Sequence, residues 1–431
     1  MSTPSMKAME PSRALITPGY VFATILIVGL FFMWGVANSL NDVLIPQFRK
    51  AFQLDDFASS LVQSAFYFGY FCFAIPASLF MRRFGYRAAV LLGLGLYGAG
   101  ALLFLPAADA SHYYAFLGAL YVIASGLAFL ETSANPLIAV MGPASSADQR
   151  LNFAQTFNPI GTMMGSYIGG LLIFSDVHHT PEEMAAMTPA ALEAFRSAEL
   201  AAVKLPYILI AALVAGWAVL VACVKFPPVD EPRGAGAGTD GGFRGLLAFP
   251  HYWLGVFAQF AYVGAQVGVW SFLIRYTQVN FPGTLEKDAL HWLPISFAIF
   301  FAGRIVGTLL MSRVNAGKLL ALFAAINVVL CLVAVATGGT TGLYALIASS
   351  FFMSIMFPTI FTISLRGLGP YTKSGSSFLV MAIIGGAVFT AIMGWVSRET
   401  SINVAYIVPA VCFAMVFVFA WASRGRTAAS A

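Results

Sequence analysis

Apolar residues follow one another along this chain in runs of about 20 or more, separated by shorter polar stretches. The apolar and polar positions do not alternate as they do in strands, so the runs predict helices long enough to cross a lipid bilayer. Twelve such segments can be counted, at approximately 18–45, 58–81, 87–107, 113–141, 152–174, 206–226, 249–277, 290–312, 318–337, 341–365, 375–397 and 403–423. The pattern predicts an all-α membrane protein with twelve transmembrane helices.

The composition excludes a soluble protein. Hydrophobic residues make up 59 % of the chain and charged residues only 10 %, whereas soluble domains carry roughly 25 % charged residues. The net charge of +5 is mild and is better explained by membrane topology than by nucleic-acid binding. The four cysteines fall inside apolar segments without the spacing of a metal site or a disulfide framework, so we expect them to be buried packing residues.

A stretch rich in Gly, Pro and charged residues, "PPVDEPRGAGAGTDGGFRG", divides the apolar segments into six plus six and indicates a flexible linker. The two halves resemble each other weakly, because "SLFMRR" (78–83) corresponds to "TLLMSR" (308–313). A duplicated six-helix unit is typical of secondary transporters. We therefore expect an N-terminal tail at 1–17, a six-helix bundle at 18–227, a linker at 228–246, a second six-helix bundle at 247–424 and a C-terminal tail at 425–431.

Lysine and arginine are distributed unevenly over the segments that connect the spans. If the N-terminus is cytoplasmic, 15 of these residues fall on the cytoplasmic side and 7 on the other, with Arg304 left inside the membrane. Cytoplasmic loops carry an excess of Lys and Arg in multi-pass proteins. The distribution therefore predicts that both termini, the tails and the linker are cytoplasmic.

Three charged residues fall within the predicted spans and away from the basic residues at the span ends, namely Asp42, Glu131 and Arg304. A charge at the centre of a bilayer costs at least roughly 2.5–3.5 kcal/mol, so such residues are candidates for a functional site. Burial favours the neutral form of a carboxyl group, which makes Glu131 and Asp42 candidates to bind and release a proton. Two structural alternatives stay open, because Glu131 could form an ion pair with Arg304 and Asp42 could reach the outer surface.

Polar and aromatic residues accompany these charges at helical spacing. Trp34, Asn38 and Asp42 share one face of the first helix. Similar stripes are formed by Glu131 with Asn135, by Gln155 and Asn158 with Thr162, and by Gln259 and Gln266 with Trp270. Carboxylates and carboxamides supply the donors and acceptors that polyols need, and indole rings pack against the apolar faces of sugar rings. The stripes predict one polar cavity, although each stripe alone could serve as hydrogen-bonding contact between helices.

Glycines recur at four-residue spacing at Gly161, Gly165 and Gly169, and again at Gly303 and Gly307. Small residues at this spacing let helix backbones approach closely, so we expect tight packing of the fifth and eighth helices. Catalytic signatures such as GxSxG, HExxH and CxxC are missing from the sequence. The motifs therefore favour a carrier over an enzyme.

Six stretches of the chain resemble the fucose permease family of the major facilitator superfamily. They are "VANSLNDVLIPQF" (36–48), "QSAFYFGYF" (63–71), "LETSANP" (130–136), "RLNFAQTFNPIG" (150–161), "AQFAYVGAQVGVWSFLIRY" (258–276) and "GSSFLVMAIIGG" (375–386). The resemblance extends from about residue 18 to about residue 423 and implies a major facilitator fold that imports a free sugar with a proton. In that family the carboxylates matching Asp42 and Glu131 are central to sugar binding and proton coupling, and the amides matching Gln155 and Asn158 line the cavity.

The chain departs from the family pattern at two places. Ser78 and Arg82 replace the Gly and Asp of the superfamily motif between helices two and three. Asn38-Ser39 replaces a pair of asparagines in the first helix, so we expect that the shorter Ser39 side chain alters which sugar hydroxyls are recognised. Related members carry glucose, galactose, mannose or amino sugars.

The combined expectation is the import of L-fucose, or of a closely related hexose or 6-deoxyhexose, by alternating access. The proton-coupling candidates are Glu131 and Asp42, the sugar-binding candidates are Asp42, Asn38, Gln155, Asn158, Gln266, Trp34 and Trp270, and Arg304 is a candidate partner of the deprotonated carboxylate. We further expect a monomer in a bacterial inner membrane, with no cofactor, metal or nucleic acid and with the proton as the coupling ion. The alternatives are a glucose/galactose-type or sodium-coupled carrier, and a membrane sugar receptor that does not transport.

Overall fold

The computed structural model describes residues 20–54, 56–173, 181–226, 242–284 and 291–423. The predicted tails at 1–17 and 425–431, and most of the linker at 228–246, lie outside these described residues. Within them the chain is helical and contains no strand. The helices are α1 (Val21–Phe52), α2 (Asp56–Asp109), α3 (Tyr113–Val140), η1 (Ala144–Ser146), α4 (Ala147–Gln155), α5 (Phe157–Ile173), α6 (Pro181–Ala186), α7 (Pro189–Cys223), η2 (Phe243–Ala248), α8 (Pro250–Asn280), α10 (Trp292–Leu310), α11 (Ala316–Thr337), α12 (Gly339–Met353), α13 (Met356–Leu365), η3 (Gly369–Tyr371), α14 (Thr372–Met381), η4 (Ala382–Ile384), α15 (Gly385–Glu399), α16 (Ile402–Ala405) and α17 (Ile407–Ala422).

The helix boundaries accommodate the twelve predicted spans. Ten helical stretches in the described residues are long and apolar enough to cross a membrane. The 54 residues of α2 would extend about 80 Å as one straight helix, far more than a bilayer core of roughly 30 Å. At Gly85 the backbone leaves the helical region (φ 82°, ψ 172°), so α2 contains two spans. Counting both, and adding α4 with α5 as one interrupted span, gives the predicted number.

The sixth predicted span, 206–226, begins earlier in the structure than the apolar run suggests. Helix α7 begins at Pro189, where the Thr188 side chain accepts a hydrogen bond from the Ala191 amide and proline occupies the first helical turn. A capping threonine followed by proline is a favourable helix start. The apolar run therefore predicted only the C-terminal part of a longer helix.

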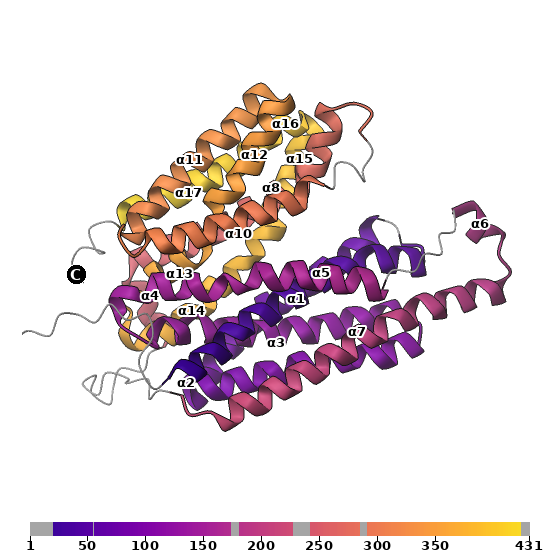
Figure 1. The fold of residues 1–431 in the computed structure, drawn as a ribbon, viewed down its shortest axis with the longest axis horizontal. Coiled ribbons are helices and arrows are strands. Elements are labelled where there is room, and N and C mark those ends of the chain that lie inside the picture. Colours follow the sequence, from indigo (N-terminus) through magenta and orange to yellow (C-terminus); the bar gives the residue numbers. More distant parts are fainter. Residues whose placement is uncertain (1–19, 55, 174–180, 227–241, 285–290, 424–431) are drawn as a thin grey trace, which may run out of the picture.

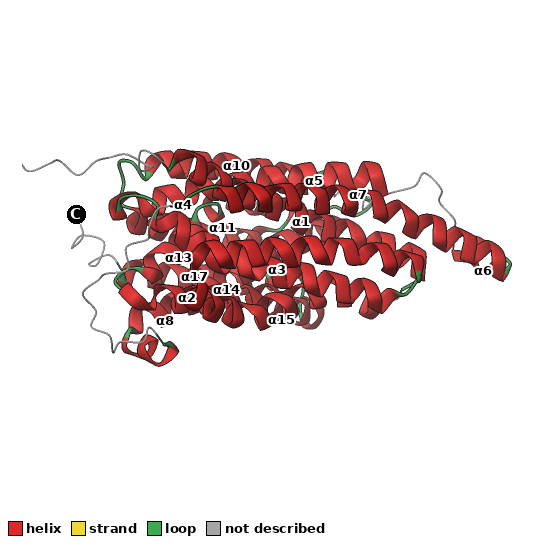
Figure 2. Cartoon of the chain, turned by 90° about the horizontal axis from the view of Figure 1, so that it is seen from below, coloured by secondary structure: helices red, strands yellow, loops and turns green. Residues whose placement is uncertain are grey.

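The helices form two groups, each with its own hydrophobic core. Figure 1 shows α1 to α7 in one group and most of α8 to α17 in the other, and Figure 2 shows the helices side by side along the long axis. Phe104 and Phe116 are buried in the first core, and Phe413 in the second. The first core continues to Phe361 of α13 and Leu379 of α14, so the two bundles meet along these helices.

Glycines bring α5 very close to α1. A Cβ at Gly161 would collide with the Phe32 carbonyl oxygen, and one at Gly165 would collide with the Ser39 side chain. The same relationship recurs in the second bundle, where Gly303 of α10 lies against the Phe351 carbonyl group of α12. The repeated glycine spacing thus corresponds to two close helix pairs, one in each bundle.

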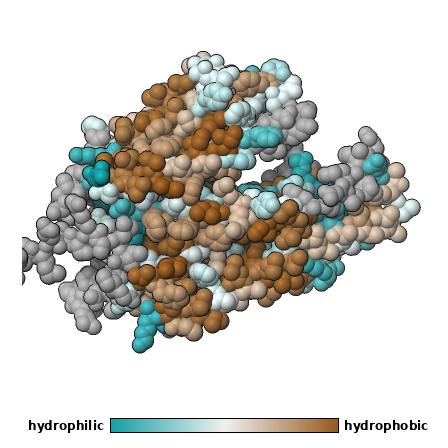
Figure 3. All heavy atoms as spheres, viewed as in Figure 1, coloured by the Kyte–Doolittle hydropathy of each residue, from teal (hydrophilic) through white to brown (hydrophobic). Residues whose placement is uncertain are grey.

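Large apolar side chains cover much of the outer surface, as Figure 3 shows on one face. Leu171, Val219 and Leu309 are each more than 60 % exposed. Exposed apolar patches of this kind indicate a surface that contacts apolar surroundings.

Candidate functional site

A cavity of about 290 Å³ lies between the two bundles. All nine residues predicted for the site line this cavity, namely Trp34, Asn38 and Asp42 of α1, Glu131 of α3, Gln155 of α4, Asn158 of α5, Gln266 and Trp270 of α8, and Arg304 of α10. In Figure 3 the surface is hollowed between the bundles on the right, away from the end where α4 begins. The size is close to the lower limit of typical small-ligand pockets.

The two carboxylates differ in their surroundings. Glu131 is only 1 % exposed, and its Oε2 atom has no hydrogen-bond partner among the described residues. Asp42 lines the cavity with an exposed side chain and accepts a hydrogen bond of 2.7 Å from Nε2 of Gln63. A buried charge without a partner is costly, so a proton on Glu131 removes a cost that Asp42 does not face to the same degree.

The predicted amides make contacts between helices while they line the cavity. Nε2 of Gln155 donates to Oδ1 of Asn135, one helical turn from Glu131, at 3.1 Å. Nδ2 of Asn158 donates to the Phe31 carbonyl oxygen at 3.3 Å and so joins α5 to α1. Each amide therefore makes a hydrogen bond to a neighbouring helix and also lines the cavity, so contact between helices and a place in the cavity are compatible.

Arg304 bonds backbone oxygens of both bundles. Its Nε donates to the Ser354 carbonyl at 2.6 Å and its Nη1 donates to the Gln155 carbonyl at 2.8 Å. Proline has no N–H and cannot donate to the carbonyl four residues earlier in a helix. Pro159 therefore leaves the Gln155 carbonyl without a helical donor, and Pro358 leaves the Ser354 carbonyl without one. In the described part of the chain Arg304 forms no ion pair, and its role as a carboxylate partner stays a prediction.

The two predicted tryptophans lie on opposite sides of the cavity. Trp34 in α1 stacks on Tyr70 at 6.4 Å and 17° between the rings. Trp270 in α8 donates from Nε1 to the Ser350 hydroxyl at 3.1 Å and meets Phe300 edge to face. Each bundle therefore presents one indole ring that is fixed by its own neighbours.

Ser39 is not among the residues that line the cavity, and the expectation that its shorter side chain alters which sugar hydroxyls are recognised stays a prediction. It is 1 % exposed, its hydroxyl donates to the Val36 carbonyl at 3.1 Å, and its side chain lies against Gly165. A smaller side chain at this position permits the close approach of α1 and α5. The side chain of Ser39 therefore takes part in the packing of α1 against α5.

Gln63 and Asn41 are cavity residues that the sequence analysis did not select. Gln63 of α2 joins the two neighbouring residues of α1, because Asn41 donates to Oε1 of Gln63 at 3.0 Å while Gln63 donates to Asp42. A signal for Gln63 was available: it is a lone carboxamide within the second apolar run.

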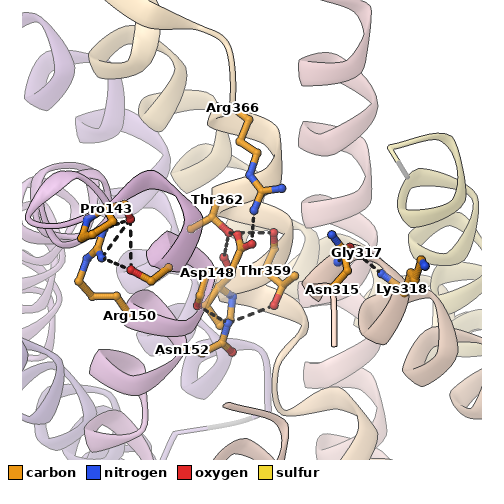
Figure 4. Close-up of polar contacts among 12 residues, drawn as sticks. Pro143, Asp148, Arg150, Asn152, Asn315, Gly317, Lys318, Thr359, Thr362 and Arg366 are labelled. Carbon is orange, nitrogen blue, oxygen red and sulfur yellow. Dashed lines mark hydrogen bonds and ion pairs between the residues drawn. The ribbon is translucent and has the colours of Figure 1, made fainter. Parts of the chain in front are cut away.

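Polar contacts join the bundles near α4, as the close-up in Figure 4 shows, and α4 lies at the end of the molecule away from the hollow (Figures 1 and 3). The carboxylate of Asp148 in α4 pairs with Arg366 and accepts a hydrogen bond from Thr362, and Nδ2 of Asn152 donates to the Thr359 hydroxyl at 3.1 Å. These contacts connect α4 to α13 and to the residue that follows it. The cavity is therefore open at one end of the molecule and closed at the other.

Ser78, which replaces the motif glycine, belongs to this closed end. Its hydroxyl donates to the Lys373 carbonyl in α14 at 2.8 Å, so it bonds α2 of the first bundle to the second bundle. The departure from the motif thus supplies a further contact between bundles.

Comparisons with known proteins agree with this architecture. A family model described as Major Facilitator Superfamily matches residues 23–372. The chain is 44 % identical to an L-fucose-proton symporter of Escherichia coli (strain K12), over 97 % of each chain, and 36 % identical to a glucose/galactose transporter of Brucella abortus, over 92 % of this chain and 93 % of that one. The crystal structure of a major facilitator superfamily transporter in the outward conformation superimposes with a TM-score of 0.87 at 44 % identity, covering 94 % of this chain and 99 % of that chain.

Proposed function

The chain belongs to the major facilitator superfamily, and from this premise we propose that it imports L-fucose, or a closely related hexose or 6-deoxyhexose, together with a proton. One observation carries the proposal: a single cavity gathers the two intramembrane carboxylates, six carboxamides and two indole rings. The fucose-proton symporter of E. coli is more similar to this chain than the glucose/galactose transporters are, which favours fucose. The protein is a transporter and not an enzyme, and the proton, rather than a cofactor, drives it.

The sugar is held by groups from both bundles. Asp42 and Asn38 of α1 offer an acceptor and an amide from one side, and Gln266 of α8 offers an amide from the other. Trp34 or Trp270 packs against the apolar face of the ring. A ligand that contacts both bundles stabilises the state in which they close around it, because it shifts an equilibrium only through its differential affinity.

The proton is carried by Glu131, with Asp42 as an intermediate acceptor nearer the open end. Glu131 is buried and lacks a partner for one oxygen among the described residues, so neutralising it removes the cost of closing the cavity around a charge. Loss of the proton on the other side of the membrane restores that cost and favours reopening. Binding of the proton and binding of the sugar thus promote the same closure.

Alternating access requires that the closed end open while the hollow closes. The contacts of Asp148 with Arg366 and of Asn152 with Thr359 must break in that change. We place the tails in the cytoplasm on the Lys/Arg distribution, which makes the hollow outward-facing. The exposed leucines and valines contact lipid of a bacterial inner membrane, and the protein works as a monomer.

Counterflow in proteoliposomes preloaded with L-fucose tests the proposal, with wild type, Glu131→Gln and Glu131→Ala compared. Exchange by Glu131→Gln without accumulation under a proton gradient supports proton coupling at Glu131. Full gradient-driven accumulation by this variant would move that role to Asp42. If the wild type exchanges glucose or galactose but not fucose, the proposed substrate is wrong and the protein is a glucose/galactose-type carrier.

The same vesicle experiments test two rival functions, a sodium-coupled carrier and a sugar receptor that does not transport. Uptake that persists without sodium removes the sodium-coupled carrier. Labelled sugar accumulated against its gradient, and recovered unchanged from inside the vesicles, removes the receptor that binds without transporting. Uptake that stops when sodium is removed would overturn proton coupling.

A further inference from the structure

Three polar side chains at the edge of the cavity form one continuous chain of hydrogen bonds. Nδ2 of Asn41 donates to Oε1 of Gln63 at 3.0 Å, and Nε2 of Gln63 donates to Oδ1 of Asp42 at 2.7 Å. Every donor points in the same direction, from Asn41 toward the carboxylate. The chain has this polarity because a deprotonated carboxylate can only accept.

The first member of the chain carries an unused acceptor. Asn41 is 2 % exposed, and its Oδ1 atom has no hydrogen-bond partner among the described residues. Buried polar atoms are nearly always bonded, so an exception calls for an explanation. The explanation offered by the geometry is that this oxygen is used when the chain runs in the opposite direction.

When Asp42 takes up a proton, the carboxyl end of the hydrogen-bond chain needs an acceptor where it needed a donor before. The carboxyl O–H then needs an acceptor, which Gln63 provides when its amide turns and presents Oε1. Nε2 of Gln63 then faces Asn41, and when the Asn41 amide turns in the same way its Oδ1 atom, unused in the present arrangement, accepts the hydrogen bond. Both arrangements hold two hydrogen bonds and leave one atom of Asn41 unbonded, so the proton on Asp42 decides between them.

We infer that Gln63 is a positioning residue for Asp42, whose amide holds the carboxylate toward the sugar and reverses its hydrogen bonds when Asp42 takes up a proton. The inference rests on the proposed function, because it assigns Gln63 to the same sugar and proton site. Other titratable groups that line the cavity are Tyr67 and Tyr70 of α2, Glu131 of α3 and Arg304 of α10. Gln63 is not titratable, but it differs from these groups in donating a hydrogen bond directly to the Asp42 carboxylate.

Gln63→Met tests the positioning role, because it keeps the length of the side chain and removes both polar atoms. Fucose counterflow at equal pH on both sides should show a KM raised roughly tenfold or more, while the maximal exchange rate changes less than about twofold. A lower maximal rate with an unchanged KM would overturn the inference. So would an unchanged KM together with an unchanged pH profile.

Gln63→Glu is a second variant of nearly the same shape, and its readout is the pH profile. Two carboxylates at hydrogen-bond distance cannot both ionise easily, so the pH of half-maximal exchange should rise by roughly one unit or more. Gln278→Glu is the matched control, since Gln278 is near the end of α8 and does not line the cavity. An equal shift in both variants would mean a general charge effect and would overturn the inference.

Asn41→Val distinguishes a relay from two separate contacts. If Asn41 acts through Gln63, this change alters the pH profile in the wild-type background and adds nothing to Gln63→Met. Additive effects of the two substitutions would overturn the inference.

An infrared measurement keeps this inference separate from the proposed function. Difference spectra recorded across the pH range should contain a carboxyl C=O band that Asp42→Asn abolishes, and Gln63→Met should displace that band without any sugar present. A displaced band together with no fucose exchange by the wild type would support the role of Gln63 and overturn only the assignment of fucose as the substrate. A band that stays in place would overturn the role of Gln63 whatever the substrate.

Discussion

Arg304 of the second bundle donates a 2.8 Å hydrogen bond to the backbone carbonyl of Gln155 in the first bundle. The carbonyl is accessible because Pro159 cannot donate to it, and the same holds for Pro358 and the Ser354 carbonyl that Arg304 also contacts. A proline in each bundle thus prepares an acceptor for one guanidinium group. Helix interruption and contact between bundles have the same origin here.

Arg304→Lys should weaken this connection, because one ammonium group replaces two donors that are separated on the guanidinium fork. We expect a loss of about 1.5–3 kcal/mol, the usual worth of a hydrogen bond to a charged group, and a roughly 10- to 150-fold shift toward the state open at the α4 end. Spin labels on Ser145 and Leu247, both exposed, report the change as a longer distance. An unchanged distance distribution would show that the bond does not hold the bundles together.

The Asp148–Arg366 ion pair makes a related prediction at the closed end. Arg366→Ala leaves Asp148, only 8 % exposed, without its cation, and Arg366 is 28 % exposed, so water weakens the pair. We expect Arg366→Ala to shift the free-energy difference between the closed and open states by about 1–3 kcal/mol in favour of opening at this end, less than the loss of a fully buried pair would. The combination of Asp148→Arg with Arg366→Asp should restore part of the lost stability of the closed state. No recovery in the exchanged pair, measured with the same labels, would assign the effect to Thr362 or to packing.

The sequence predicted the spans and the cavity residues well for a physical reason. A bilayer requires about 20 apolar residues per span, so any charge inside a span is conspicuous, and Asp42 and Glu131 were found in this way. Helical spacing then selected Trp34 and Asn38, because residues four apart share a face. These signals are local and can be read without knowing how the helices pack.

The contacts of Arg304, Gln63 and Ser39 could not be predicted because they depend on which helices are neighbours. Nothing near residue 304 in the sequence indicates that carbonyls at 155 and 354 lie beside it. Ser39 is close in sequence to the cavity residue Asn38, but a helix turns about 100° per residue, and Ser39 faces α5 instead. Packing between helices decided these three cases.

Trp270 offers a test that separates ring stacking from hydrogen bonding. Trp270→Phe removes the donor to Ser350 and reduces the ring, and Ser350→Ala removes only that hydrogen bond. We expect Trp270→Phe to raise the KM for fucose roughly 3- to 10-fold, in line with an aromatic contact of about 0.5–1.5 kcal/mol. Ser350→Ala should have a smaller effect in the same counterflow assay. Equal effects of both substitutions would mean that the indole is held in place but does not touch the sugar.

Two glycines of the same helix should respond in opposite ways to an added methyl group. Gly165 lies against α1, where a Cβ would meet the Ser39 hydroxyl and would lie 2.9 Å from the Val36 Cα atom, whereas a Cβ at Gly170 would meet nothing within 4 Å. Overpacking of this kind typically costs about 1–3 kcal/mol. Gly165→Ala should therefore lower the thermal unfolding temperature in detergent, and Gly170→Ala, which improves helix propensity, should leave it unchanged or raise it. Ser39→Ala combined with Gly165→Ala should recover only part of the loss, because the contact with the Val36 backbone remains. Equal behaviour of the two glycine variants would mean that α1 and α5 adjust their separation easily, contrary to the close contact observed.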